Sequence, residues 1–201
     1  MSRSENRNSP GFAVTGIVLA GGRGQRMGGA DKGLELLESR PMVEFVIARF
    51  APQVDELLIV ANRNLERYGS FGHRVVSDAI GDFAGPLAGL HRGMCEAANE
   101  LVCTVPCDSP FLPADLVTRL RMPVEAGADL AVATTGGRQQ PVFCLTRRSL
   151  LPQLESYLAS GQRRFDGWYA ALRTVAVLFD DDTAFANINT AAELRAFDKP
   201  R

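Results

Sequence analysis

Short apolar runs alternate with helical patterns along most of the chain, and this alternation constrains the fold more than any other feature. The runs have the length of buried strands and cover residues 16–20, 57–61, 74–77, 101–105, 130–134, 142–145 and 174–179. Most are continuous stretches of Val, Ile and Leu, which is typical of strands covered on both faces. The pattern therefore predicts an α/β fold, a three-layer sandwich around a mostly parallel, Rossmann-like central sheet.

Helical patterns fill the spaces between these runs. One begins after Pro41, a second covers residues 86–99, a third begins near Pro113, and a fourth carries an apolar stripe over residues 150–158. The last begins at Thr190, where Thr-Ala-Ala-Glu matches a capping box. No long linker or internal repeat interrupts the pattern, so we predict one domain over residues 14–201.

Composition excludes several classes of protein. Residues 1–13 are polar, lack the apolar centre of a signal peptide and are expected to form a disordered tail. No apolar run reaches the roughly 18 residues that span a bilayer. A formal net charge of −1 argues against a general nucleic-acid or membrane surface. The four cysteines lack zinc-site spacing and are expected to be reduced, which favours a cytoplasmic location.

A glycine-rich segment follows the first apolar run. Five glycines lie between residues 21 and 29, and Arg23, Arg26 and Lys32 are interspersed with or follow them. Glycine backbones approach a ligand closely, and consecutive free N–H groups form an anion-binding concavity. The segment therefore predicts a polyphosphate site, against the alternative of a flexible surface turn.

The segment matches neither common nucleotide motif. A P-loop needs Gly-Lys-Ser/Thr, but Lys32 lies between Asp31 and Gly33. In the dinucleotide fingerprint a glycine follows Gly24 after two residues, whereas here Gly28 comes one residue late.

Residues 19–32 instead resemble the pattern L-A-[AG]-G-x-[GS]-x-R-M-G-x-x-K, with three residues rather than two between Gly28 and Lys32. This pattern resembles the loop of nucleotidyltransferases that load a nucleotide onto a phosphorylated acceptor, whose fold is of the nucleotide-diphospho-sugar transferase type. Within that superfamily, Gly21-Gly22 with Asp31-Lys32-Gly33 most resembles the molybdenum cofactor guanylyltransferases. Further matching segments lie at residues 61–63, 85–89, 106–110 and 187–190, so the resemblance spans roughly residues 15–198.

The resemblance implies a reaction in which GMP passes from GTP to the terminal phosphate of the molybdenum cofactor (Mo-molybdopterin). Its products are molybdopterin guanine dinucleotide and pyrophosphate. It also implies Mg²⁺ as cofactor, and cofactor-delivery proteins or recipient molybdoenzymes as partners. The alternatives are a cytidylyltransferase on the same cofactor, a sugar-1-phosphate nucleotidyltransferase or, from another class, a non-catalytic nucleotide-binding protein.

Asp108 is the candidate metal ligand. It follows the buried run 101–105 in the sequence Pro-Cys-Asp-Ser-Pro, where a carboxylate is well placed to hold Mg²⁺. The alternative is an Asp that caps the next turn. The resemblance favours metal binding, because the matching Asp of the family coordinates Mg²⁺ and contacts the nucleotide.

Arg26, Lys32 and Asp108 are the candidate catalytic residues. The acceptor phosphate would attack the α-phosphorus of the triphosphate, and fixed cations with Mg²⁺ would stabilise the charge that develops. An acceptor phosphate is already ionised near pH 7, so neither a protein nucleophile nor a general base is needed.

The resemblance assigns eight positions to nucleotide binding: Leu19, Ala20, Gly21, Gly22, Lys32, Asn62, Asp78 and Asp108. Asn62 and Asp78 each close an apolar run, and each would contact either the guanine or the ribose. Both could instead be turn residues that bond to their own backbone.

The candidate acceptor site is less sharply defined. Gly85 and Pro86 begin a predicted helix whose N–H groups would face the acceptor or base, against the alternative of a simple chain reversal. Asn187 and Asn189 precede another helix start, where free N–H groups favour anions, and in the family this motif lies by the acceptor pocket. Arg163 would meet a pterin phosphate, or it belongs to a solvated charged surface.

Overall fold

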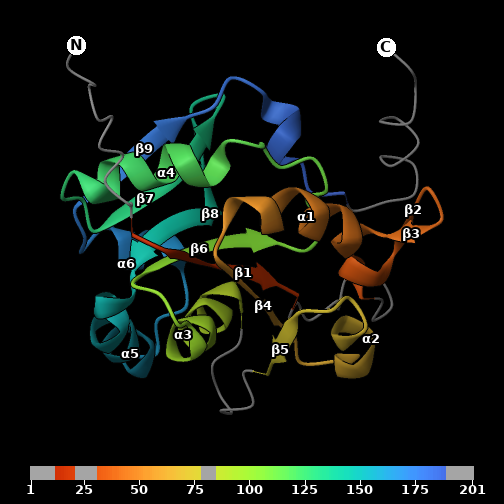
Figure 1. The fold of residues 1–201 in the computed structure, drawn as a ribbon. Coiled ribbons are helices and arrows are strands. Elements are labelled where there is room, and N and C mark those ends of the chain that lie inside the picture. Colours follow the sequence, from red (N-terminus) through yellow and green to blue (C-terminus); the bar gives the residue numbers. More distant parts are fainter. Residues whose placement is uncertain (1–11, 21–30, 78–84, 189–201) are drawn as a thin grey trace, which may run out of the picture.

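A seven-stranded sheet runs through the computed structural model, which describes residues 12–20, 31–77 and 85–188 (Figure 1). Its strands, in spatial order, are β5 (Arg74–Val76), β4 (Glu56–Val60), β1 (Val14–Leu19), β6 (Leu101–Pro106), β8 (Arg138–Arg147), β7 (Leu130–Thr135) and β9 (Thr174–Leu178). All seven predicted runs are strands, although β8 is much longer than expected.

Strand pairing is mostly parallel, as predicted. β1 lies between β4 and β6 and pairs parallel with both, and β4–β5 and β7–β9 are also parallel. β8 is antiparallel to both of its neighbours, β6 and β7. The carboxyl ends of β1, β4 and β6 therefore meet at one edge, which lies at the right of the sheet in Figure 1.

Helices cover both faces of the sheet and complete the predicted three layers (Figure 1). α1 (Met42–Phe50) and α4 (Leu116–Glu125) contribute to one apolar cluster, and α3 (Pro86–Glu96), α5 (Leu151–Ala159) and α6 (Phe165–Tyr169) contribute to the other. Side chains of β1 alternate between the clusters, since Val18 packs in the first and Ile17 in the second. A Cβ on Gly93 would lie 2.2 Å from Ile17 Cδ1, so α3 approaches β1 this closely only with glycine there.

Shorter elements surround the edge where β1 ends. These are η1 (Lys32–Leu34), the hairpin of β2 (Leu36–Leu37) and β3 (Arg40–Pro41), and α2 (Leu65–Gly69). Three more short helices are η2 (Ala51–Gln53), η3 (Arg148–Leu150) and η4 (Asp182–Phe185). The hairpin was not predicted from the sequence, and its turn places Glu38 and Ser39 at positive φ.

The predicted helices differ from the observed ones mainly at their ends. The helix expected over residues 86–99 ends at Glu96, and α4 begins at Leu116 rather than at Pro113. The Pro113 carbonyl accepts a hydrogen bond from the Leu116 N–H in the turn before α4. The helix expected from Thr190 lies outside the described residues.

The remaining predictions concern the whole chain. Of the expected tail, only Phe12 and Ala13 are described, and both are exposed. The described part of residues 14–201 is arranged around the one large sheet and the β2–β3 hairpin, and a single domain stays a prediction. Within the described ranges, every helix is too short or too polar to cross a membrane. The four cysteines are free, with only Cys95 exposed.

Candidate active site

The end of β1 is held between its two neighbours. Leu19 and Ala20, both predicted nucleotide contacts, are buried at this point. The Ala20 N–H donates a hydrogen bond to the Val60 carbonyl oxygen at 2.8 Å, and the Cys107 N–H donates to the Leu19 carbonyl oxygen at 3.1 Å. The backbone that leads into the glycine-rich segment is therefore fixed on both sides. Ligands of open α/β sheets bind beyond such strand ends.

Lys32 and Asp108 form an ion pair at this edge. Lys32 Nζ lies 3.4 Å from Asp108 Oδ2, although the residues are 76 positions apart in the chain. The Asp108 side chain is 11% exposed and the Lys32 side chain 37%. Burial raises the pKa of the Asp108 carboxyl above its ordinary value, and the nearby Lys32 ammonium partly opposes that rise. The structure thus joins two of the three predicted catalytic residues.

Asp31 anchors the residue next to Lys32. The Tyr68 hydroxyl donates to Asp31 Oδ1 at 2.6 Å, and Asn64 Nδ2 donates to Asp31 Oδ2 at 2.9 Å. Tyr68 is fully buried, and its pKa is raised first by burial and further by nearby acidic groups, so its hydroxyl keeps its proton. Both carboxylate oxygens of Asp31 are therefore bound by α2 and the residue before it. Sequence reasoning missed Tyr68 and Asn64.

Gly33 lets this segment lie directly against its neighbours. A Cβ built there would lie 2.6 Å from the Tyr68 hydroxyl oxygen and 3.0 Å from Cys107 Sγ. Real Cβ atoms do not approach other atoms so closely, so a side chain would push η1 away. In the Asp31-Lys32-Gly33 motif, Asp31 therefore anchors the segment, Lys32 supplies the cation and Gly33 allows the close contact.

The predicted acceptor residue Asn187 also reaches this edge. Ser109 Oγ donates a hydrogen bond to Asn187 Oδ1 at 2.7 Å, and the Ile188 N–H donates to the Asp108 carbonyl oxygen at 3.0 Å. Asn187 is thus fixed to the residue that follows Asp108, although 78 positions separate it from Ser109. The loop after β6 therefore connects Lys32 with the Asn187 segment.

Other predicted site residues lie at the ends of nearby elements. Asn62 follows β4, is exposed, and accepts a hydrogen bond from Ser77 Oγ at 3.3 Å. Gly85 precedes α3 with φ +110°, and Pro86 is the first residue of that helix. This φ favours glycine, and proline suits the first helical position. Both observations also fit a chain reversal, so a ligand contact by Gly85 or Pro86 stays a prediction.

Five predicted site residues lie outside the described part of the chain: Gly21, Gly22, Arg26, Asp78 and Asn189. Arg163 is described and is engaged at the end of α5. Its Nη1 donates to the carbonyl oxygens of Leu158 and Gln162, both at 2.7 Å. A contact between Arg163 and an acceptor therefore stays a prediction.

The chemistry of the donors fits a phosphate and a hard cation. Lys32 offers N–H donors to phosphate oxygens, and Asp108 offers carboxylate oxygens of the kind that Mg²⁺ prefers. Among the described residues, Asp108 is not part of any group of three His, Cys, Asp or Glu side chains with metal-ligand spacing. A metal at Asp108 would therefore draw its other ligands from phosphate and water, which is how Mg²⁺ is commonly bound.

Comparisons with known proteins agree on one family. The family described as "MobA-like NTP transferase domain" matches residues 16–175. The molybdenum cofactor guanylyltransferase of Cupriavidus taiwanensis is 54% identical over 189 residues, covering 91% of this chain and 95% of that protein. The protein of the same name from Burkholderia ambifaria is 49% identical, covering 94% of this chain and 97% of that protein.

Solved structures share the fold. The molybdopterin-guanine dinucleotide biosynthesis protein A of Archaeoglobus fulgidus superposes with a TM-score of 0.76 at 22% identity, covering 90% of this chain and 95% of that one. The 4-diphosphocytidyl-2C-methyl-D-erythritol synthase of Anaerococcus prevotii superposes with a TM-score of 0.73 at 15% identity, covering 92% and 93%. At these identities the superpositions show the nucleotidyltransferase fold alone.

Proposed function

Since this chain belongs to the family of molybdenum cofactor guanylyltransferases, we propose that Lys32 and Asp108 form the centre at which it performs that family's reaction. The enzyme transfers the guanylyl group of GTP to Mo-molybdopterin and so makes molybdopterin guanine dinucleotide. The observation that carries the proposal is the 3.4 Å contact between Lys32 Nζ and the buried Asp108 carboxylate, at the edge where β1 and β6 end.

Asp108 would hold Mg²⁺ at the phosphates of GTP. When bound, Mg²⁺ supplies positive charge to the α-phosphate and to the departing pyrophosphate. Burial makes the bare Asp108 carboxylate costly and raises the pKa of this group. A cation that replaces lost hydration therefore interacts strongly with it.

Lys32 would donate hydrogen bonds to phosphate oxygens, with Arg26 as a second cation. Both charges would be more useful in the transition state than in the ground state, because negative charge builds up on the leaving pyrophosphate. The acceptor phosphate attacks the α-phosphorus while already ionised, so the protein's task is to bind and align the two substrates.

The nucleotide would lie along the strand ends. The backbone at Leu19 and Ala20, continuing into Gly21 and Gly22, would contact its phosphates and ribose. Asn62 would contact the base or ribose, and its hydrogen bond with Ser77 supports this, because Ser77 precedes Asp78. Asn62 and Asp78 would then act from neighbouring strand ends, β4 and β5.

The acceptor would lie on the other side of Asp108. Asn187 supports this placement, because Ser109 binds it next to the proposed metal ligand. Asn189, Gly85 and Pro86 would line the same pocket, and Arg163 would reach a pterin phosphate.

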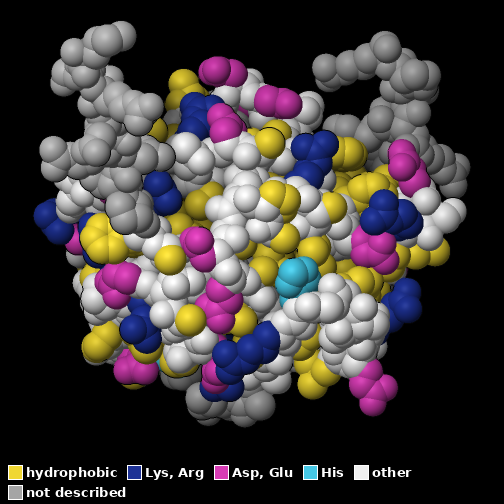
Figure 2. Space-filling view, in the orientation of Figure 1, with side chains coloured by type: hydrophobic (Ala, Val, Ile, Leu, Met, Phe, Trp, Pro, Cys, Tyr) yellow, Lys and Arg dark blue, Asp and Glu magenta, His cyan; other side chains and the backbone are white. Residues whose placement is uncertain are grey.

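We place the enzyme in the cytoplasm, where cofactor-delivery proteins or recipient molybdoenzymes would be its partners. A net charge of −1 argues against nucleic-acid or membrane partners. On the face drawn in Figure 2, basic and acidic side chains are interspersed, which agrees with the low net charge.

Pyrophosphate release from GTP in the presence of molybdenum cofactor tests the assignment of Asp108. Asp108→Asn keeps the shape of the side chain and removes its charge, so turnover at saturating Mg²⁺ should fall roughly 10²- to 10³-fold while GTP affinity changes much less. Asp115→Asn is the matched control, because Asp115 is exposed and pairs with Arg119 on α4. Near-normal turnover by Asp108→Asn would remove Asp108 from the mechanism.

A further inference from the structure

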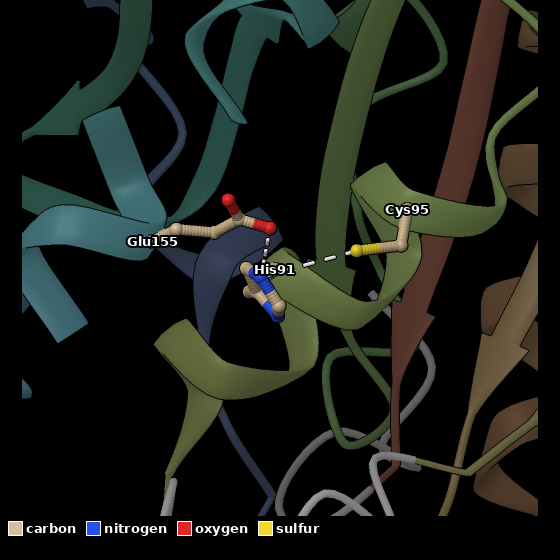
Figure 3. Close-up of side chains that lie close together, drawn as sticks. All are labelled: His91, Cys95 and Glu155. Atoms are coloured by element: carbon tan, nitrogen blue, oxygen red, sulfur yellow. Dashed lines mark hydrogen bonds and ion pairs between the residues drawn. The ribbon is translucent and has the colours of Figure 1, made fainter. Parts of the chain in front are cut away.

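Three side chains of different chemistry converge between α3 and α5, outside the site described above. His91 and Cys95 come from the second half of α3, and Glu155 comes from α5 (Figure 3). The spacing of four residues places His91 and Cys95 on one side of their helix. Their ligand atoms and the nearest Glu155 oxygen all lie within 4.8 Å of one another.

Two of the three distances between the ligand atoms are close to those of a tetrahedral zinc site. His91 Nε2 lies 3.3 Å from Glu155 Oε1, and Cys95 Sγ lies 3.9 Å from His91 Nε2. Tetrahedral angles and ordinary zinc bond lengths require about 3.3 Å between nitrogen and oxygen ligands and about 3.6 Å between nitrogen and sulfur. The first distance already fits, and a shift of about 0.3 Å would satisfy the second.

The three side chains differ in exposure, and each exposure suits a metal ligand. His91 is 7% exposed and its position is fixed by the packing of α3. Cys95 and Glu155 are exposed, so their side chains can turn toward a metal and a water molecule can occupy a fourth position. A nitrogen, a sulfur and an oxygen ligand with one open position suit Zn²⁺.

We propose that His91, Cys95 and Glu155 bind one Zn²⁺ ion that clamps α3 to α5. The site is separate from the proposed Mg²⁺ site at Asp108 and uses none of its residues. Its three ligands come from α3 and α5, which are neighbouring helices on the same face of the sheet. Zinc binding would therefore stabilise the fold.

Co²⁺ added to the metal-stripped, full-length protein tests the site, because cobalt bound to a thiolate gives a charge-transfer absorption in the near ultraviolet. We expect this absorption to saturate at one Co²⁺ per chain and to disappear when Zn²⁺ displaces it. Cys95→Ser should abolish it, and Glu155→Gln and His91→Asn should weaken cobalt binding at least tenfold. Absence of the absorption in the wild type, or its survival in Cys95→Ser, would overturn the proposal.

Matched controls separate this site from the rest of the protein. Cys107→Ser and Asp108→Asn should keep the absorption, which shows that the metal is not bound at the catalytic edge. His73→Ala and Glu66→Gln change a histidine and a glutamate elsewhere and should also keep it. Loss of the absorption in Cys107→Ser, with retention in Cys95→Ser, would place the metal at Cys107 and refute the proposal.

Thermal unfolding provides a second readout that does not depend on cobalt. With free Zn²⁺ at about 100 times its Kd, the Tm of the wild type should rise by roughly 5–10 °C. The exposed position of Cys95 makes Cys95→Ser a variant that should fold normally, and its Tm should not respond to Zn²⁺. An equal zinc response in both proteins would contradict the clamp.

Discussion

Gly33→Ala tests whether the packing of η1 sets the position of Lys32. The new Cβ would lie 2.6 Å from the Tyr68 hydroxyl oxygen, whereas ordinary contacts begin at 3.4 Å. Either η1 or Tyr68 must then move by about 0.8 Å, and overpacking of this kind typically costs about 1–3 kcal/mol. For a chain of this length, that corresponds to a decrease in Tm of roughly 2–12 °C.

The same displacement should reduce catalysis. Lys32 precedes Gly33 directly and holds its amine 3.4 Å from Asp108. A misplacement near 1 Å can cost about 10²-fold in rate, so we expect kcat/KM for guanylyl transfer to fall by roughly 10- to 100-fold. Pyrophosphate release, measured with GTP and molybdenum cofactor varied in turn, gives this quantity.

Gly69→Ala is the matched control. A Cβ on Gly69, at the end of α2, would meet nothing within 4 Å, and its φ is not positive. This variant should keep the wild-type kcat/KM and an unchanged or slightly higher Tm, because alanine favours helix over glycine. If Gly33→Ala matched Gly69→Ala in both Tm and kcat/KM, the proposed link between η1 packing and Lys32 would be wrong.

Three further predictions concern the same edge of the sheet. Asp108→Asn should raise Tm near pH 7, because the pKa of Asp108 is raised in the folded state and its ionised form therefore costs stability. That stability returns as pH falls through the raised pKa. Calorimetry at neutral and acidic pH checks this, and a lower Tm for the variant at pH 7 would contradict it. Tyr68→Phe removes one of the two donors to Asp31 and should cost about 1–3 kcal/mol of unfolding free energy in denaturant titrations, with a loss of turnover; an unchanged free energy would show that this hydrogen bond is dispensable. Asn187→Ala should raise KM for the molybdenum cofactor with little change for GTP in steady-state kinetics, and parallel loss of stability and GTP binding would make Asn187 a structural residue.

The strands could be predicted because burial on both faces leaves continuous apolar runs. β8 was predicted too short, since its first residues, Arg-Gln-Gln-Pro, carry no apolar signal. The first three of them pair with the end of β7 beyond an irregularity in register. The β2–β3 hairpin has two residues in each strand, too few to show a period.

The candidate site could be predicted only in part. Lys32 was predicted from the glycine-rich segment and Asp108 from its place after a buried strand, the resemblance favoured both roles, and the structure places the two side chains in contact. The bond from Tyr68 to Asp31 spans 37 positions and leaves no local pattern. The four-residue spacing of His91 and Cys95 is a local signal in the sequence, but Glu155 lies 60 positions beyond Cys95 and leaves no such pattern.

The most direct test of the account is pyrophosphate release by the purified protein from GTP, ATP, CTP and UTP, each with Mg²⁺ and molybdenum cofactor. A base that leaves polar groups of the site unpaired should cost about 1–3 kcal/mol for each group. We therefore predict that kcat/KM for GTP exceeds that for every other triphosphate by at least about tenfold, and that release requires the cofactor. Equal or faster release from CTP, or release from GTP that is independent of the cofactor, would contradict guanylyl transfer at this site.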